Sequence, residues 1–380
     1  MLSRRMFSCA ALGLLAALPA HSATWQSLGF PGRGVPNFLF VDNGISLVVD
    51  EGFLTTPQCC PSVVHVHRGD HDGSSASTLE TLGPTARLFG AAQFSGGVAA
   101  LVNDNGTFVI KHYSFSGVIT TITPGVPAGT AGPLASDGQT LYAVWDNNLL
   151  SLSSLSGSWA SGPALPVSLP AGRRQHGVVR GAQVYWQMTT SLLRFTPPST
   201  FDTIPFPAGY QIRDLSAWTE AGGVIYVVVT SPANTAAMLE FSPIDTVMAY
   251  DSTFAFQDYS GAWVLGSDVL VGAFDRSGDH FGVLLAFDTG AKTWSEFSPQ
   301  GPWFQVFGQI TNVAVDGGVP YVAWERLSFE TVSRLQQEPP PPPPPFALDA
   351  PILSPGGLLA LAALLAGLAL RRIGRGRLSG

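Results

Sequence analysis

Five acidic residues stand where short apolar segments of the chain come to an end. They close the second strand of predicted repeats and are Asp50, Asp104, Asp146, Asp275 and Glu325. If these strands meet around a common axis, the carboxylates gather at one mouth and concentrate negative potential there. Oxygen donors of this kind hold Ca²⁺ or a cationic ligand. The alternative is turn chemistry, because Asp favours turns whatever their function.

The densest collection of metal-ligating residue types lies in one short segment. It holds three histidines, His65, His67 and His71, beside the carboxylates of Asp70 and Asp72. His65 and His67 are two apart on a predicted strand and therefore share one face. Three imidazoles with a carboxylate can hold Zn²⁺, although the spacing matches no standard zinc motif. The alternative is that these are solvated residues of a strand edge and a loop.

Two adjacent cysteines, Cys59 and Cys60, are the only ones beyond the first 23 residues. In an oxidising compartment they would form a strained vicinal disulfide or pair between molecules rather than stay as free thiols. They lie in a long predicted insertion, residues 52–61, which is a candidate contact surface.

Catalytic signatures are missing from the sequence. It contains no G-x-S-x-G elbow, no H-E-x-x-H, no P-loop and no dinucleotide-binding fingerprint. Paired carboxylates could act as acid and base in a polysaccharide hydrolase or lyase, but no spacing selects such a pair. We therefore expect a binding protein, with that enzyme as the alternative.

The elements that position these residues repeat along the chain. A turn glycine followed by an alternating apolar strand recurs at Gly44, Gly97, Gly138, Gly181, Gly223, Gly266 and Gly318. A third strand and an outer strand follow in most repeats, as at Leu149–Leu152 and Phe201–Phe206. Four short strands per repeat of 41 to 53 residues predict an all-β, seven-bladed β-propeller. Insertions in the first and last repeats leave six or eight blades open.

The last repeat ends after its third strand, near Leu335, with no outer strand before the prolines that follow. The segment Thr24–Leu28 stands alone at the other end of this body, and it resembles the outer strand Thr293–Phe297. We predict that the N-terminal strand completes the last blade and so covers edges that would otherwise pair with other chains.

Parts of the repeats resemble known propeller families. The stretch Trp159–Pro166, with Gly181 and Tyr185, resembles a kelch repeat, and Gly317–Tyr321 adds to this. The kelch resemblance implies a propeller fold and a binding habit, not a reaction. The segment Asp288–Trp294 is similar to an Asp box of sialidase-like propellers, and we expect it to mark a turn between the third and fourth strands.

The composition favours a turn-rich body. Only 12% of residues are charged, 46% are hydrophobic, 42 are Gly and 30 are Pro, which excludes a disordered charged chain and a coiled coil. The formal net charge is -7, and six of the 19 basic residues are arginines at the two ends of the chain. The body between them is strongly acidic, so we expect no nucleic-acid partner.

The ends of the chain predict its destination. Residues 1–23 have the basic start, apolar stretch and small residues of a secretory signal peptide. After the predicted propeller, residues 24–337, comes a proline-rich stalk at 338–349, which predicts an extended spacer. Residues 350–380 hold an apolar run followed by four arginines, which predicts one C-terminal transmembrane helix with its arginines on the cytoplasmic side.

The C-terminal segment resembles the bacterial sorting signals handled by exosortase-type enzymes, closest to the class called IPTL-CTERM. Its matching positions are Pro351, Leu353 and Gly357, whereas Ala350, Ile352 and Gly356 depart from the pattern. The resemblance covers about 30 of the 380 residues. It implies an exosortase-type processing enzyme as partner, transient anchoring in the membrane, cleavage near the motif, and delivery to the cell surface or outside. A plain single-pass anchor is the alternative.

These features together predict an exported bacterial cell-envelope protein. Its propeller would bind a surface glycan, an extracellular polymer or another surface protein. The polysaccharide hydrolase or lyase is one alternative, and a structural surface component that assembles with itself is another.

Overall fold

The structure is a computed structural model. It describes residues 23–28, 34–53, 62–70, 75–126, 128–169, 176–212, 217–256, 258–274, 282–299, 309–326 and 329–337. Residues 23–336 form one compact unit, and the description below concerns that unit. Within the described ranges every regular element is a β-strand, so the all-β prediction is confirmed.

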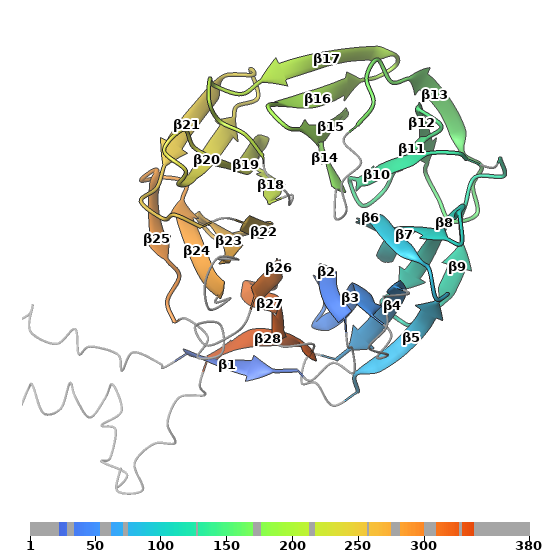
Figure 1. Cartoon of the computed structure of the whole chain (residues 1–380), viewed down its shortest axis with the longest axis horizontal. Coiled ribbons are helices and arrows are strands. Elements are labelled where there is room, and N and C mark those ends of the chain that lie inside the picture. The colour runs from blue at the N-terminus through green and yellow to red at the C-terminus, as the bar shows by residue number, and fades with distance from the viewer. Residues whose placement is uncertain are drawn as a thin grey trace, which may run out of the picture. The chain divides into compact units, whose positions relative to one another are not determined.

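The described strands form five four-stranded sheets and one eight-stranded sheet. The eight-stranded sheet consists of two antiparallel halves joined by a parallel pairing of the two inner strands, with Ala135 opposite Gly177. We number the resulting four-stranded units 1 to 7 in chain order. Figure 1 shows them arranged around an axis, with the first strand of each unit nearest the centre.

The strands of the first four units have the following bounds. Unit 1 holds β2 (Gly34–Asp42), β3 (Ile45–Phe53), β4 (Ser62–Gly69) and β5 (Ser77–Leu82). Unit 2 holds β6 (Arg87–Phe94), β7 (Gly97–Asp104), β8 (Thr107–Ser114) and β9 (Ile119–Thr121). Unit 3 holds β10 (Ala131–Ser136), β11 (Leu141–Trp145), β12 (Asn148–Leu152) and β13 (Ala160–Ala164). Unit 4 holds β14 (His176–Arg180), β15 (Gln183–Met188), β16 (Ser191–Thr196) and β17 (Thr200–Pro205).

The remaining strands complete the ring. Unit 5 holds β18 (Trp218–Ala221), β19 (Val224–Thr230), β20 (Ala236–Phe241) and β21 (Val247–Asp251). Unit 6 holds β22 (Asp258–Leu265), β23 (Asp268–Phe274), β24 (Gly282–Asp288) and β25 (Thr293–Glu296). Unit 7 holds β26 (Gln309–Asp316), β27 (Val319–Arg326), β28 (Phe329–Gln337) and β1 (Ala23–Ser27).

The N-terminal strand completes the last sheet, as predicted. The strand order is β1-β28-β27-β26, so the first strand of the chain forms the outer edge of unit 7. Figure 1 shows β1 alongside β28 at the rim. The Leu28 amide also donates to the Val332 carbonyl at 2.7 Å. This pairing covers the outer edge of β28 and joins the two ends of the ring.

The predicted turn glycines lie between the first and second strands of their units. Six of the seven have a positive φ, as at Gly138 (φ 86) and Gly318 (φ 79), a conformation that glycine adopts without steric cost. Gly97 instead begins β7, and the positive φ falls on Ser95 and Gly96. The repeat read from glycine spacing is therefore the structural repeat.

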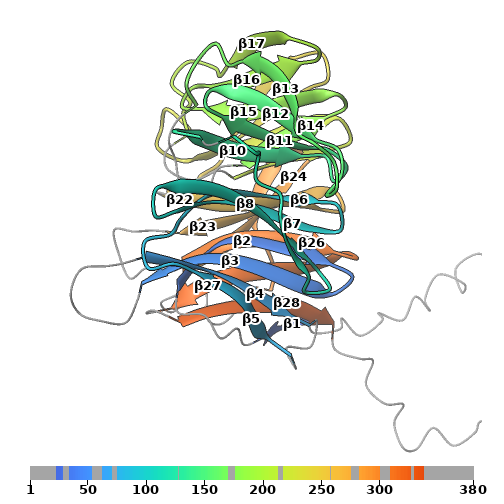
Figure 2. The same cartoon turned by 90° about the vertical axis from the view of Figure 1, so that its right-hand side faces the viewer.

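The hydrophobic core is divided among the interfaces between neighbouring sheets. Each cluster of buried apolar side chains joins two successive units, and one joins unit 7 to unit 1 through Ala314, Leu39 and Val48. Figure 2 shows the sheets stacked against one another. Because both faces of each sheet are covered by neighbours, the strands contain continuous hydrophobic runs such as Val224–Val229.

The segment resembling an Asp box is a turn, as expected. Asp288 ends β24, and its Oδ1 accepts the amides of Gly290 and Ala291, both at 2.7 Å. These two hydrogen bonds lower the pKa of the Asp288 carboxyl. The turn leads directly into β25.

No helix among the described residues is long and apolar enough to cross a membrane. The predicted signal peptide, the stalk, the apolar C-terminal run and the sorting positions Pro351, Leu353 and Gly357 lie outside the described residues.

Candidate functional site

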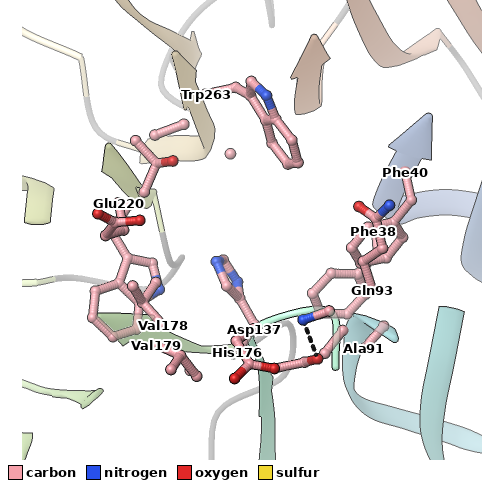
Figure 3. A pocket seen from close by; sticks show the side chains of 18 of the residues that line it. Phe38, Phe40, Ala91, Gln93, Asp137, His176, Val178, Val179, Glu220 and Trp263 are labelled. Carbon is pink, nitrogen blue, oxygen red and sulfur yellow. Dashed lines mark hydrogen bonds between the residues drawn. The ribbon is translucent and has the colours of Figure 1, made fainter. Parts of the chain in front are cut away.

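A cavity of about 630 Å³ lies on the axis of the ring. All seven units contribute to its lining, chiefly through residues of their first strands. Its size falls within the range of small-molecule binding sites, and such sites are commonly lined by aromatic side chains with a few polar groups. Figure 3 shows this cavity with Trp263 and His176 projecting into it from opposite sides.

Most of the first strands, which line the cavity, are irregularly paired with the second strand of their unit. In units 1, 2, 3, 6 and 7 the pairing of the first strand with the second shifts register, which is the mark of a β-bulge. In unit 6 the irregular residue is Gly261, with φ 61. A Cβ at Gly261 would lie 2.7 Å from Asn312 Oδ1, so only glycine fits there. Trp263, two residues later, lines the cavity.

Aromatic rings form much of the cavity wall. Phe38 and Phe40 stack with ring centroids 6.2 Å apart and an angle of 12°. Phe38 also meets the ring of His176 edge to face at 6.4 Å, which brings the first strands of units 1 and 4 together across the axis. His176 in turn lies 5.9 Å from the ring of Trp218. These contacts hold the imidazole among rings rather than charges.

His176 is uncharged at neutral pH. Burial among its neighbours lowers its pKa to about 4, because the charged form loses its water; a hydrogen bond to the backbone of Trp218 opposes the shift. The ring is half-buried and lines the cavity. It therefore presents a neutral imidazole to anything that enters.

Among the described residues, the carboxylates that line the cavity are those of Glu220 and Asp137. The Glu220 Oε1 accepts the Gly223 amide at 2.7 Å, and the Asp137 Oδ1 accepts the amides of Gln139 at 2.8 Å and Thr140 at 2.6 Å. Each carboxylate keeps one oxygen without a partner among the described residues. These free oxygens can accept hydrogen bonds from a ligand.

Trp218 adds a buried donor to the same wall. Its side chain is 1% exposed, and its Nε1 has no hydrogen-bond partner. An unpaired buried donor costs free energy, and native structures contain few of them. A ligand oxygen within reach of this group would satisfy it.

None of the described side chains of the predicted acidic ring lines this cavity. Asp50 lies within β3 rather than at its end, and its side chain is fully buried. Asp104 ends β7 and accepts a hydrogen bond from Asn105 Nδ2 at 2.9 Å. Asp146 Oδ1 accepts the amides of Gly129 at 2.7 Å and Thr130 at 3.0 Å.

The other members of the predicted ring give no side-chain geometry. Asp275 and the side chain of Glu325 lie outside the described residues. Among the residues that the structure describes, no group of three or more His, Cys, Asp or Glu could hold a metal ion. The Ca²⁺ hypothesis therefore stays a prediction.

One residue of the histidine segment, His67, is buried and paired inside the sheet. The ring nitrogens of His67 lie 2.7 Å from Asp50 Oδ2 and 3.0 Å from Thr78 Oγ1, and the residue is 2% exposed. His67 is thus not the solvated edge residue of the alternative interpretation. His65 is half-buried, and its Nδ1 lies 3.0 Å from Thr81 Oγ1. His71, Cys59 and Cys60 lie outside the described residues.

Sequence reasoning missed the cavity residues because it followed the ends of second strands. The cavity is lined by the first strands of the units. Asp137, Gly138 and Gly181, which lie in turns between first and second strands, also line it. The glycine pattern predicts the turns between first and second strands. Because the first strands directly precede these glycines, their residues were the sequence signal from which the cavity lining could have been predicted. Trp263, Glu220 and His176 have no shared spacing that would have marked them as one site.

Comparison with known proteins identifies the fold. The sequence matches no protein-family model, and no curated protein is similar to it. Solved structures do match. A streptogramin B lyase is 12% identical, with a TM-score of 0.59 over 83% of this chain and 97% of that chain. A catalytically inactive virginiamycin B lyase from Staphylococcus aureus with quinupristin is 11% identical, with a TM-score of 0.58 over 83% and 99%.

A third solved structure to which the chain is similar is itself a β-propeller domain. It is the β-propeller domain of the Trilobed protease from Pyrococcus furiosus, 9% identical, with a TM-score of 0.52 over 83% of this chain and 98% of that chain. At these identities the likeness concerns the fold alone. The chain has a β-propeller fold.

Proposed function

We propose that this chain is an exported bacterial cell-envelope protein whose seven-bladed propeller binds a surface glycan or a related extracellular ligand in its central cavity. The observation that carries the proposal is the axial cavity of about 630 Å³, to which every unit contributes and which combines aromatic walls with open carboxylate oxygens. Such a combination fits a sugar ring, whose apolar face stacks on aromatic rings while its hydroxyls donate hydrogen bonds.

Export is part of the same proposal. The basic and apolar start of the chain supports secretion, and the proline stalk with the apolar run and arginines supports membrane anchoring. An exosortase-type enzyme would then process the tail near Pro351, Leu353 and Gly357. Mass spectrometry of the protein from intact cells tests this, since cleavage would remove the C-terminal arginines.

Trp263 is the side chain on which to test binding. It is half-buried and projects into the cavity, so Trp263→Ala removes a stacking surface, together with part of its packing against two core clusters. We expect a glycan that binds the purified full chain to lose about tenfold or more in affinity, measured by calorimetry. The matched control is Trp159→Ala, which removes an equally half-buried indole just before β13. Equal losses in both variants would refute the cavity as the binding site.

Polysaccharide cleavage is the second candidate function. It is favoured by the presence of Glu220 and Asp137 in one cavity beside the neutral imidazole of His176. Carboxyl and imidazole groups can serve as general acids and bases. Product formation from a bound glycan, abolished by Glu220→Gln with binding retained, would establish this activity.

A further inference from the structure

The charge of the cavity lining distinguishes among sugars. Glu220 and Asp137 are the charged side chains of the described lining, which contains no Lys or Arg. The formal net charge of the chain is also negative, at -7. Negative charge inside a cleft raises the local concentration of cations and disfavours anions. An acidic sugar would meet two carboxylates there and no compensating cation among the described lining residues.

The charged hydrogen-bonding groups of the described lining are acceptors. Glu220 and Asp137 each offer one carboxylate oxygen that accepts no bond from the described protein. A carboxylate accepts but does not donate, and bonds from a charged donor are about twice as strong as neutral ones. An ammonium group supplies three such donors, whereas an N-acetyl group supplies one neutral donor.

The aromatic walls are compatible with the same ligand. Trp263 projects into the cavity opposite His176, and the stacked rings of Phe38 and Phe40 lie to one side. Aromatic faces attract cations, Trp most strongly.

We infer that the cavity is selective for sugars that carry a free amine, and that it ranks an amino sugar above its N-acetylated form and both above a uronic acid. The inference rests on the proposed binding function and specifies its ligand class. Glu220 supplies most of the ranking, because it is half-buried beside Trp218 whereas Asp137 is exposed.

The test compares three oligosaccharides of equal length on the purified full chain. They are a glucosamine trimer, an N-acetylglucosamine trimer and a galacturonate trimer, titrated by calorimetry at low and physiological salt. We expect the glucosamine trimer to bind about five- to tenfold more tightly than the N-acetylated trimer, with a smaller ratio at higher salt. We expect the galacturonate trimer to bind most weakly.

Two variants assign the selectivity to the cavity. Glu220→Gln should reduce the amine preference to about twofold or less, while binding of the N-acetylated trimer changes little. The matched control is Glu296→Gln, which removes the same charge from an exposed position on β25 and should leave the ratio unchanged. If the ratio of the two affinities falls equally in both variants, the amine preference arises from the net charge of the protein and not from Glu220.

Other outcomes separate the two proposals. If the galacturonate trimer binds as tightly as the others and Trp263→Ala weakens it, the amine selectivity is wrong and the binding cavity stands. If glycans outside this set bind in a Trp263-dependent way and none of the three trimers does, the ligand class is again wrong. If no glycan binds the full chain, both proposals fail.

Discussion

Two histidines of this protein lie in opposite environments. His67 in unit 1 is 2% exposed, and its ring nitrogens lie within hydrogen-bond distance of Asp50 and Thr78. His176 in unit 4 lines the central cavity, where its ring contacts the aromatic rings of Phe38 and Trp218. The carboxylate of Asp50 holds His67 inside one sheet, whereas rings from two other units surround His176.

The difference shows that local density of reactive residue types is a poor guide to a site. The cluster around His67 is dense because β3, β4 and β5 are adjacent in one sheet and their buried polar groups satisfy one another. His176 lies in a stretch of sequence, residues 147–201, that contains no acidic residue, no cysteine and no other histidine, yet the fold brings it opposite Trp263. Groups already paired inside a sheet are not available to a ligand.

Removal of the buried carboxylate should have the largest effect. Asp50→Ala leaves His67 buried without its partner and also removes the acceptor of the His65 amide, 3.3 Å away. We expect a loss of about 3 to 5 kcal/mol in the free energy of unfolding, measured by urea denaturation. Asp104→Ala is the matched control and should cost less than about 1 kcal/mol, since Asp104 is only half-buried. An unchanged midpoint for Asp50→Ala would show that the pair is not structural.

The cavity histidine should affect the pH dependence of stability. The folded pKa of His176, about 4, lies below its ordinary value of 6.5, so below pH 6.5 the unfolded chain binds a proton that the folded chain does not. Its contribution to stability is therefore present above pH 6.5 and is lost as the pH falls toward 4. The loss is at most about 3 kcal/mol. Urea denaturation between pH 7.5 and 4.5 measures it.

The matched variant for this titration is His176→Gln, which keeps a polar side chain without the proton equilibrium. Its stability should fall less between pH 7.5 and 4.5 than that of the unmodified chain. His65 and His112, whose pKa values burial also lowers, remain in both proteins and cancel in the comparison. Parallel pH profiles for the two proteins would contradict the low pKa of His176.

The smallest effect is expected at an exposed member of the acidic ring. Asp146→Ala removes the acceptor of the Gly129 and Thr130 amides and places alanine at φ 49, so we expect a loss of about 1 kcal/mol by urea denaturation. Asp146→Asn, which tolerates this backbone conformation, should lose less. A melting temperature that rises with millimolar Ca²⁺, and no longer rises in Asp146→Ala, would instead support the predicted cation site.

The repeat of the fold could be predicted from the amino-acid sequence alone. Glycine at the turn between first and second strands recurs because few other residues adopt a positive φ without cost, and the apolar strands that follow have a period that survives without any tertiary information. The completion of the last sheet by Thr24–Leu28 was also predictable. The last repeat had no outer strand in sequence, and the N-terminal strand belonged to no other repeat. Turns and strands can be predicted in this way because their preferences depend on residues that are close in sequence.

Which side chains face the axis follows from the tertiary structure and not from any pattern within one repeat. A β-bulge turns a first strand so that Trp263 lines the cavity, and the parallel pairing of β10 with β14 places His176 against Phe38 from the other side of the ring. The contact between Phe38 and His176 joins units 1 and 4, which are not neighbours in sequence. The site exists because ring closure fixes the distances among first strands, and no spacing within one repeat encodes those distances.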